Sequence, residues 1–132
     1  MRQLKTYIIE DSPVIRQSLI ETLEELVPVK VVGASDNELA ALHWLADLHN
    51  RVDLVIVDLF LKSGSGLGVL RNIKPSRQPC KVVVLSNYAT KDIRLKCLEL
   101  GADQVFDKST EIESLIAYCG DLAEGPSELS VL

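Results

Sequence analysis

Four polar segments each follow a short apolar run of the sequence. Glu10 and Asp11 follow LKTYII, and Asp58 follows LVIV. Ser86 closes the run KVVVLS, and Lys108 follows QVFD. If these runs are parallel strands of one sheet, their carboxyl ends meet along one edge. We therefore expect three carboxylates, a hydroxyl and an ammonium to share a crevice there.

The residue types in this crevice predict a divalent cation and phosphoryl transfer. Carboxylates a few ångströms apart raise one another's pKa unless a cation lies between them, and Mg²⁺ prefers hard oxygen ligands. A metal and a lysine neutralise the charge that develops on a transferred phosphoryl group, and aspartate is a nucleophile in aspartyl-phosphate chemistry. Asp58 follows the expected central strand. We therefore predict Asp58 as the nucleophile and Glu10 and Asp11 as Mg²⁺ ligands.

Short apolar runs alternate with longer helical patterns along the whole chain. The runs are LKTYII, VKVVGA, LVIV, KVVVL and QVF. They are nearly continuous rather than alternating, as expected for strands covered on both faces. This order predicts an α/β fold, a flavodoxin-like (βα)5 doubly wound parallel sheet with strand order 2-1-3-4-5. In that order the strands that end at Glu10, Asp58, Ser86 and Lys108 are neighbours.

Polar residues that precede helical patterns predict where the helices begin. The candidate caps are Ser12 before Pro13, Ser35 with Glu38, Thr90, and Thr110 with Glu113. A serine or threonine accepts hydrogen bonds from the first helical amides, and a glutamate three places later completes a capping box. Gly101 predicts the end of the helix that Thr90 begins, because glycine adopts the left-handed conformation common there.

Length and charge limit the classes of function. The chain has 132 residues and a formal net charge of -5. We expect one domain over residues 1–124, a short tail at residues 125–132 and no effector domain. The acidic balance argues against direct nucleic-acid binding, and no apolar run approaches the roughly 20 residues that span a membrane. We predict a cytoplasmic protein without membrane contact whose three cysteines are reduced.

Taken together, these motifs resemble a response-regulator receiver domain of the stand-alone type, the phosphoacceptor module of bacterial two-component signalling. The resemblance extends from about Lys5 to about Leu122. The matching positions are the acidic pair Glu10 and Asp11, the phosphoacceptor Asp58, the glycine Gly66 eight places later, the switch residue Ser86 and the lysine Lys108.

The resemblance implies a mechanism, a cofactor and partners. Asp58 would take a phosphoryl group from the phosphohistidine of a histidine kinase or histidine phosphotransfer protein, and the main-chain carbonyl of Phe60 would complete the Mg²⁺ site. Ser86 would then swing towards the phosphate and Lys108 would pair with it, which would shift the surface formed by the fourth helix, fifth strand and fifth helix. This surface would contact a downstream protein target. Such a domain is a signalling module and not an enzyme.

Three positions depart from the family pattern. Lys62 stands where the family usually has a proline, and a more mobile loop or a partner contact would follow. Val105 stands where members often carry Tyr or Phe, and Phe106 is no substitute because neighbouring strand residues point to opposite faces. Ser109 stands where a proline commonly follows the lysine.

Phe60 and Tyr88 lie two places after Asp58 and Ser86. In the family these positions flank the path of the water that removes phosphate. Two bulky aromatic side chains there predict slow loss of phosphate.

Two other classes of function remain open. A Mg²⁺-dependent phosphohydrolase with Asp58 as nucleophile usually carries a second aspartate two places later, where this chain has Phe60. A phosphate-independent interaction module on the same fold is the second alternative.

The stretch GSGLG is a poor nucleotide loop, because its spacing is not G-x-G-x-x-G and no G-K-[ST] is present. In the receiver interpretation, the first helix docks the kinase, with Ile15 and Arg16 as candidate contacts.

Overall fold

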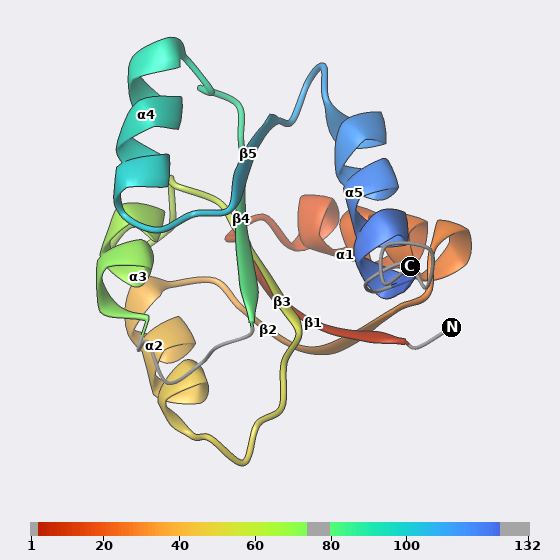
Figure 1. Ribbon diagram of the computed structural model, residues 1–132. Helices are drawn as coiled ribbons and strands as arrows, with labels where there is room; N and C mark the ends of the chain where they lie inside the picture. The colour runs from red at the N-terminus through yellow and green to blue at the C-terminus, as the bar shows by residue number, and fades with distance from the viewer. Residues whose placement is uncertain (1–2, 74–79, 125–132) are drawn as a thin grey trace, which may run out of the picture.

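The computed structural model describes residues 3–73 and 80–124, and these form one parallel sheet with helices on both sides (Figure 1). The strands are β1 (Leu4–Ile9), β2 (Val29–Ser35), β3 (Leu54–Val57), β4 (Lys81–Ser86) and β5 (Gln104–Asp107). The helices are α1 (Pro13–Leu26), α2 (Glu38–Ala46), α3 (Gly66–Asn72), α4 (Lys91–Glu99) and α5 (Ile112–Glu124). The strand order is β2-β1-β3-β4-β5, which confirms the predicted fold class.

The sheet is covered on both faces, so its central strands are buried on both sides. Helices α1 and α5 lie on one face and α2, α3 and α4 on the other (Figure 1). All four residues of β3 are buried, as the unbroken apolar run LVIV predicts. Two apolar clusters result, one under each helix layer. In the α2 layer the ring of Trp44 stacks on Tyr7 with centroids 4.1 Å apart, so packing accounts for this half-buried tryptophan.

Two of the predicted helix starts are confirmed. Ser12 precedes Pro13 at the first position of α1 and its hydroxyl accepts from the amide of Ile15 at 3.3 Å. Thr90 caps α4 in the same way. Gly101 follows α4 with φ 107°, the left-handed conformation expected at a helix end.

The predicted capping box of Ser35 and Glu38 is wrong. Ser35 is the last residue of β2, where it pairs with Ile9 of β1 and its hydroxyl accepts a hydrogen bond from Tyr7. The cap of α2 is Asn37, whose side chain accepts from the amide of Ala40 at 2.8 Å. Strand β2 extends to Ser35, one residue beyond the apolar run, because Ser35 pairs with Ile9 and bonds to Tyr7 within the sheet.

The predicted start of α5 at Thr110 is one residue early. The helix begins at Ile112, and the carbonyl of Glu111 accepts from Leu115. The amide of Thr110 donates instead to the side chain of Asp107 at 3.2 Å. The turn after β5 is therefore organised by Asp107 rather than by a threonine cap.

The three cysteines are free thiols, as predicted, and all three are buried. Burial raises the pKa of Cys119 to about 12, so this thiol is not reactive at neutral pH. None of the helices in residues 3–73 and 80–124 is long and apolar enough to cross a membrane. The predicted tail at residues 125–132 lies outside the described residues.

The inward face of α1 predicts a matched pair of stability effects. Leu23, on the inward face of α1, is fully buried, whereas Leu26 on the same helix is largely exposed. We expect Leu23→Ala to lower the free energy of unfolding by about 2–5 kcal/mol, because it leaves a cavity. Leu26→Ala should change it by no more than about 0.5 kcal/mol. Urea denaturation measures both, and equal losses would contradict the burial of this face.

Candidate metal centre

The pairing of parallel strands brings the predicted site residues to one edge of the sheet. Ile9 and Val57 are directly paired, and the amide of Asp58 donates to the carbonyl of Ile9 at 2.9 Å. Glu10 and Asp58 follow the ends of two neighbouring strands and therefore lie side by side. On the other side of β3, the amide of Lys108 donates to the carbonyl of Ser86 at 3.0 Å.

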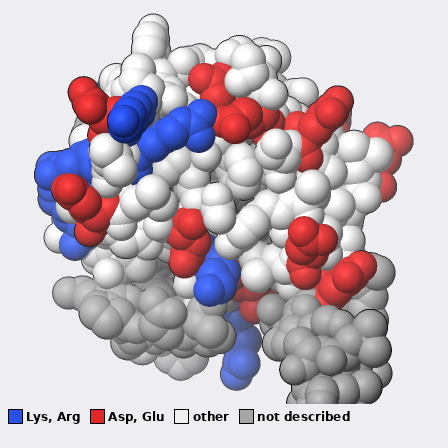
Figure 2. All heavy atoms as spheres, turned by 45° about the horizontal axis from the view of Figure 1, so that its top comes forward, with Lys and Arg blue, Asp and Glu red and all other residues white. Residues whose placement is uncertain are grey.

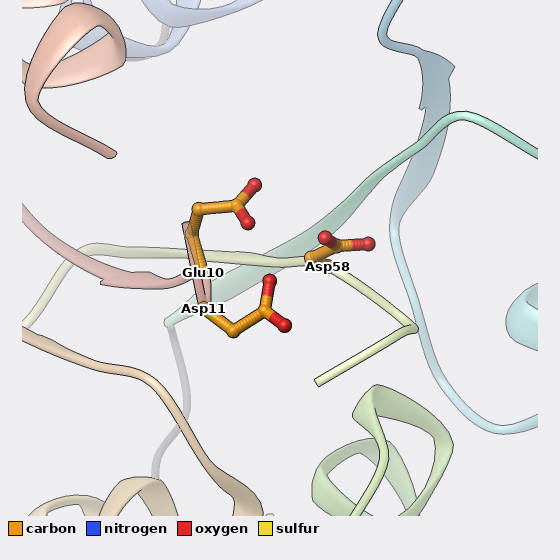
Figure 3. A group of neighbouring side chains, drawn as sticks. All are labelled: Glu10, Asp11 and Asp58. Carbon is orange, nitrogen blue, oxygen red and sulfur yellow. The ribbon is translucent and has the colours of Figure 1, made fainter. Parts of the chain in front are cut away.

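Three carboxylates face a shared space at this edge. Glu10, Asp11 and Asp58 each place one carboxylate oxygen within 4.8 Å of the others (Figure 3). Glu10 is 3% exposed and Asp58 7%, whereas Asp11 is only partly buried. Hard oxygen donors at this spacing fit a divalent ion such as Mg²⁺, which is bound through one or two carboxylates and retains several waters.

Lys108 supplies the positive charge of the site. Its ammonium group donates to an oxygen of Asp58 at 2.9 Å and to Oε1 of Glu10. Burial alone would lower the pKa of Lys108, but the bonds to Glu10 and Asp58 outweigh burial and hold this pKa above its usual value. Lys108 is therefore charged and fixed against the acidic cluster.

Backbone amides hold the carboxylates in place. The amide of Ser12 donates to Oε2 of Glu10 at 3.1 Å, so both oxygens of Glu10 have partners. The amide of Phe60 donates to Oδ1 of Asp58 at 3.3 Å. The guanidinium of Arg16 donates to the carbonyl of Glu10 at 2.8 Å, so this predicted docking residue also supports the site.

The hydroxyl of Ser86 lies at the end of β4 and is buried. It accepts from the amide of Tyr88 at 3.1 Å. Tyr88 and Phe60 stand at the rim, 54–60% exposed, with their rings edge to face and centroids 5.1 Å apart. The two aromatic side chains that were expected to flank the site are thus in contact with each other.

Arg94 was not predicted to have a role in the site. Its guanidinium group on α4 donates to the carbonyls of Ala89 and Val105 and to the carboxylate of Glu111. It therefore ties together the loop after β4, strand β5 and the start of α5. Val105 is the position at which the family often has an aromatic residue. An arginine on a helix four residues after the cap carries no sequence signal for such a role.

Gly66 lies against the backbone that carries Asp58. A Cβ atom at Gly66 would lie 2.3 Å from the carbonyl oxygen of Asp58, closer than any stable contact. The amide of Gly66 also donates to the carbonyl of Leu59 at 3.0 Å. The glycine eight places after Asp58 is therefore required by close packing of α3 on the end of β3.

We expect Gly66→Ala to lower the free energy of unfolding by about 1–3 kcal/mol, because the added methyl must displace backbone. Gly120→Ala is the control, since a Cβ there would meet only Val27 at 3.6 Å, an ordinary contact. In a helix this control should stabilise by up to about 1 kcal/mol. Urea denaturation without metal measures both variants, and a Gly66→Ala protein as stable as the control would contradict the described packing.

Comparisons with known proteins agree with this geometry. The family model of the response regulator receiver domain matches residues 6–119. A cyclic di-GMP phosphodiesterase of Thermotoga maritima is 32% identical over 108 residues, 82% of this chain and 28% of that protein. The transcriptional regulatory protein MalR of Bacillus subtilis is 26% identical over 83% of this chain and 46% of its own length. The chain thus spans less than half of the length of these two relatives.

Solved structures show the same fold. The receiver domain of the response regulator NarL from Mycobacterium tuberculosis superposes with a TM-score of 0.81 at 21% identity, over 96% of this chain and 100% of that one. The phosphorylated cyanobacterial phytochrome response regulator RcpA gives a TM-score of 0.72 at 26% identity, with 92% of each chain covered. Together with the family model, these matches show that the chain belongs to the response-regulator receiver domains, the signalling domains of two-component systems.

Proposed function

We propose that this chain is a phosphoacceptor whose Asp58 takes a phosphoryl group from the phosphohistidine of a histidine kinase or histidine phosphotransfer protein. The observation that carries the proposal is the contact of Lys108 with both Glu10 and Asp58 beside a three-carboxylate cluster. Receiver domains bind Mg²⁺ at such an acidic pocket. The solved structure of the relative RcpA, 26% identical to this chain, is of the phosphorylated form.

The roles of the residues follow from their positions. Glu10, Asp11, Asp58 and the main-chain carbonyl of Phe60 would hold Mg²⁺, which neutralises charge on the phosphoryl oxygens. An oxygen of Asp58 attacks phosphorus, the P–N bond to histidine breaks, and an aspartyl phosphate forms. Lys108 already donates to this carboxylate, so its ammonium is in place to pair with the added charge.

Phosphorylation would be read on the surface of α4, β5 and α5. The hydroxyl of Ser86 would turn to the phosphate and leave the amide of Tyr88, to which it is now bonded. Arg94 links the loop that follows Ser86 to β5 and α5. Lys and Arg side chains gather on the side of Figure 2 where α4 lies in Figure 1, and α4 carries Lys91, Arg94 and Lys96. We propose a downstream protein target for this surface and no direct contact with nucleic acid or membrane.

A groove beside the site supports docking of the phosphodonor on α1. The groove has a volume of about 420 Å³ and lies between α1 and α5. Val14 and Ile15 of α1 line it together with Lys108, so a partner seated there reaches the acidic cluster. Both α1 residues are exposed apolar side chains. A cytoplasmic phosphodonor protein with an apolar surface fits this place.

Two alternatives of other classes are weaker. A phosphohydrolase would place a second acid where Phe60 stands, and the side chain of Phe60 is an exposed hydrocarbon ring. A phosphate-independent module would have no use for a buried carboxylate pair with a largely buried lysine, which is costly to maintain. We therefore propose phosphorylation without catalytic turnover of an external substrate.

The proposal predicts a covalent phosphoryl group on Asp58. Incubation with a small-molecule phosphodonor should add one phosphoryl mass to the natural protein in the presence of Mg²⁺, and none after chelation or in Asp58→Asn. Intact mass spectrometry measures the increment. Asp53→Asn is a matched control at the opposite end of β3, where Asp53 accepts from Lys5, and it should be phosphorylated normally. No increment in the natural protein, with Mg²⁺ binding demonstrated, would favour the phosphate-independent module.

The aromatic pair predicts slow loss of the phosphate. Replacing Phe60 and Tyr88 together by asparagine should open the path of water and speed hydrolysis about tenfold, which corresponds to about 1.4 kcal/mol in the barrier. The decay of the phosphorylated mass measures the half-life. Leu98→Asn, an exposed apolar position on α4, is the control and should leave the half-life unchanged. An unchanged half-life in the double variant would refute the shielding role.

A further inference from the structure

The loop between β3 and α3 is fastened to the start of α2. The amide of Glu38 donates to the carbonyl of Ser63 at 3.1 Å, and Asn37 pairs with Ser63 as an isolated parallel bridge. The carboxylate of Glu38 reaches back across the loop and accepts from the amide of Ser65 at 2.9 Å. Glu38 therefore holds this loop through its backbone and through its side chain.

This attachment leads to the candidate metal centre. Ser65 is paired with Phe60 as an isolated antiparallel bridge. Phe60 in turn donates its amide to Oδ1 of Asp58 at 3.3 Å. A continuous set of contacts thus runs from the carboxylate of Glu38 through Ser65 and Phe60 to the side chain of Asp58.

Two glycines of the loop make room for Glu38. A Cβ atom at Gly64 would lie 2.5 Å from the Cβ of Glu38, and one at Gly68 would lie 2.3 Å from both of its carboxylate oxygens. Gly64 also has φ 78°, which favours glycine. The stretch GSGLG, a poor nucleotide loop, is therefore a cradle in which the outer glycines accommodate a carboxylate from another helix.

We propose that Glu38 is a positioning residue for the metal centre. By holding Ser65 it fixes Phe60, whose carbonyl is a proposed Mg²⁺ ligand and whose amide orients Asp58. Loss of the Glu38 carboxylate therefore weakens Mg²⁺ binding although no ligand is removed. Groups that orient metal ligands commonly affect metal affinity in this way. The inference rests on the proposed function in one respect, the use of the Phe60 carbonyl as a ligand.

The test compares Mg²⁺ affinity with stability in a set of full-length variants. Glu38→Ala should weaken Mg²⁺ binding about tenfold, measured by calorimetric titration. In metal-free protein the NMR signal of the Ser65 amide should shift and its hydrogen exchange should speed up. Glu38→Gln retains the Oε1 acceptor and should bind Mg²⁺ within about twofold of the natural protein. Gly68→Ala should weaken binding like Glu38→Ala, because its methyl displaces the carboxylate.

Glu24→Ala is the matched control. Glu24 on α1 also accepts from a backbone amide of another element, that of Val31 in β2 at 2.9 Å, and it lies outside the loop. This variant should leave Mg²⁺ affinity unchanged even where it lowers stability. Equal weakening by Glu24→Ala and Glu38→Ala would overturn the proposal, because general loss of stability would then explain both.

The failures of the two proposals are distinguishable. Mg²⁺ binding of natural strength by Glu38→Ala, with a shifted Ser65 amide, overturns the positioning role and leaves the phosphoacceptor proposal intact. If Glu38→Ala does not fold, Gly68→Ala decides, and natural affinity in that variant overturns the positioning role. A natural protein that does not bind Mg²⁺ overturns both proposals.

Discussion

One largely buried ammonium shared between two buried carboxylates is the interaction on which the rest of this structure depends. Lys108 donates to both Glu10 and Asp58, and Asp11 brings a third carboxylate close to them. A buried charge is costly unless it is paired, and one ammonium balances only one carboxylate. The cluster therefore keeps a local excess of negative charge, for which a divalent cation is the natural partner. The electrostatics of the cluster, more than any single side chain, point to Mg²⁺.

Backbone pairing and backbone amide groups hold these charged side chains together. The parallel register pairs Ile9 with Val57 and so sets Glu10 beside Asp58, and amide groups donate to carboxylate oxygens of both acids. Close packing at Gly66 brings α3 against the carbonyl of Asp58. Fixed donors of this kind do not need to reorganise when charge is added, which is the property that phosphoryl transfer requires.

The fold and the meeting of these residues were predictable because both follow from periodicity. Unbroken apolar runs indicate parallel strands, and parallel strands place their carboxyl ends together. Helix starts were predictable only where no other partner competed. Ser12 has no alternative in the sheet and caps α1, whereas Ser35 is held in β2 by its pairing with Ile9 and by Tyr7.

Contacts between distant segments were beyond sequence reasoning. Glu38 has the spacing of a capping box, yet its carboxylate binds Ser65, far along the chain. The available signal was the pair of outer glycines in GSGLG, and its meaning depends on which helix packs against them. Only the three-dimensional structure shows that the space left by Gly64 and Gly68 is filled by the side chain of Glu38.

Arg94 shows how the same surface is organised where the family pattern fails. Val105 cannot provide an aromatic side chain, but its carbonyl accepts from the guanidinium of Arg94, which also binds Ala89 and Glu111. Ala89 lies three residues after Ser86, in the loop that would move with Ser86 in the proposed response to phosphorylation. Because one guanidinium group binds the loop, β5 and Glu111 just before α5, the proposed displacement of the loop would either break these hydrogen bonds or move β5 and the start of α5 with it. On that proposal, coupling between the acidic cluster and the outer surface would rest on the three directional hydrogen bonds of Arg94, two to backbone carbonyls and one to the carboxylate of Glu111, and would not require an aromatic side chain at Val105.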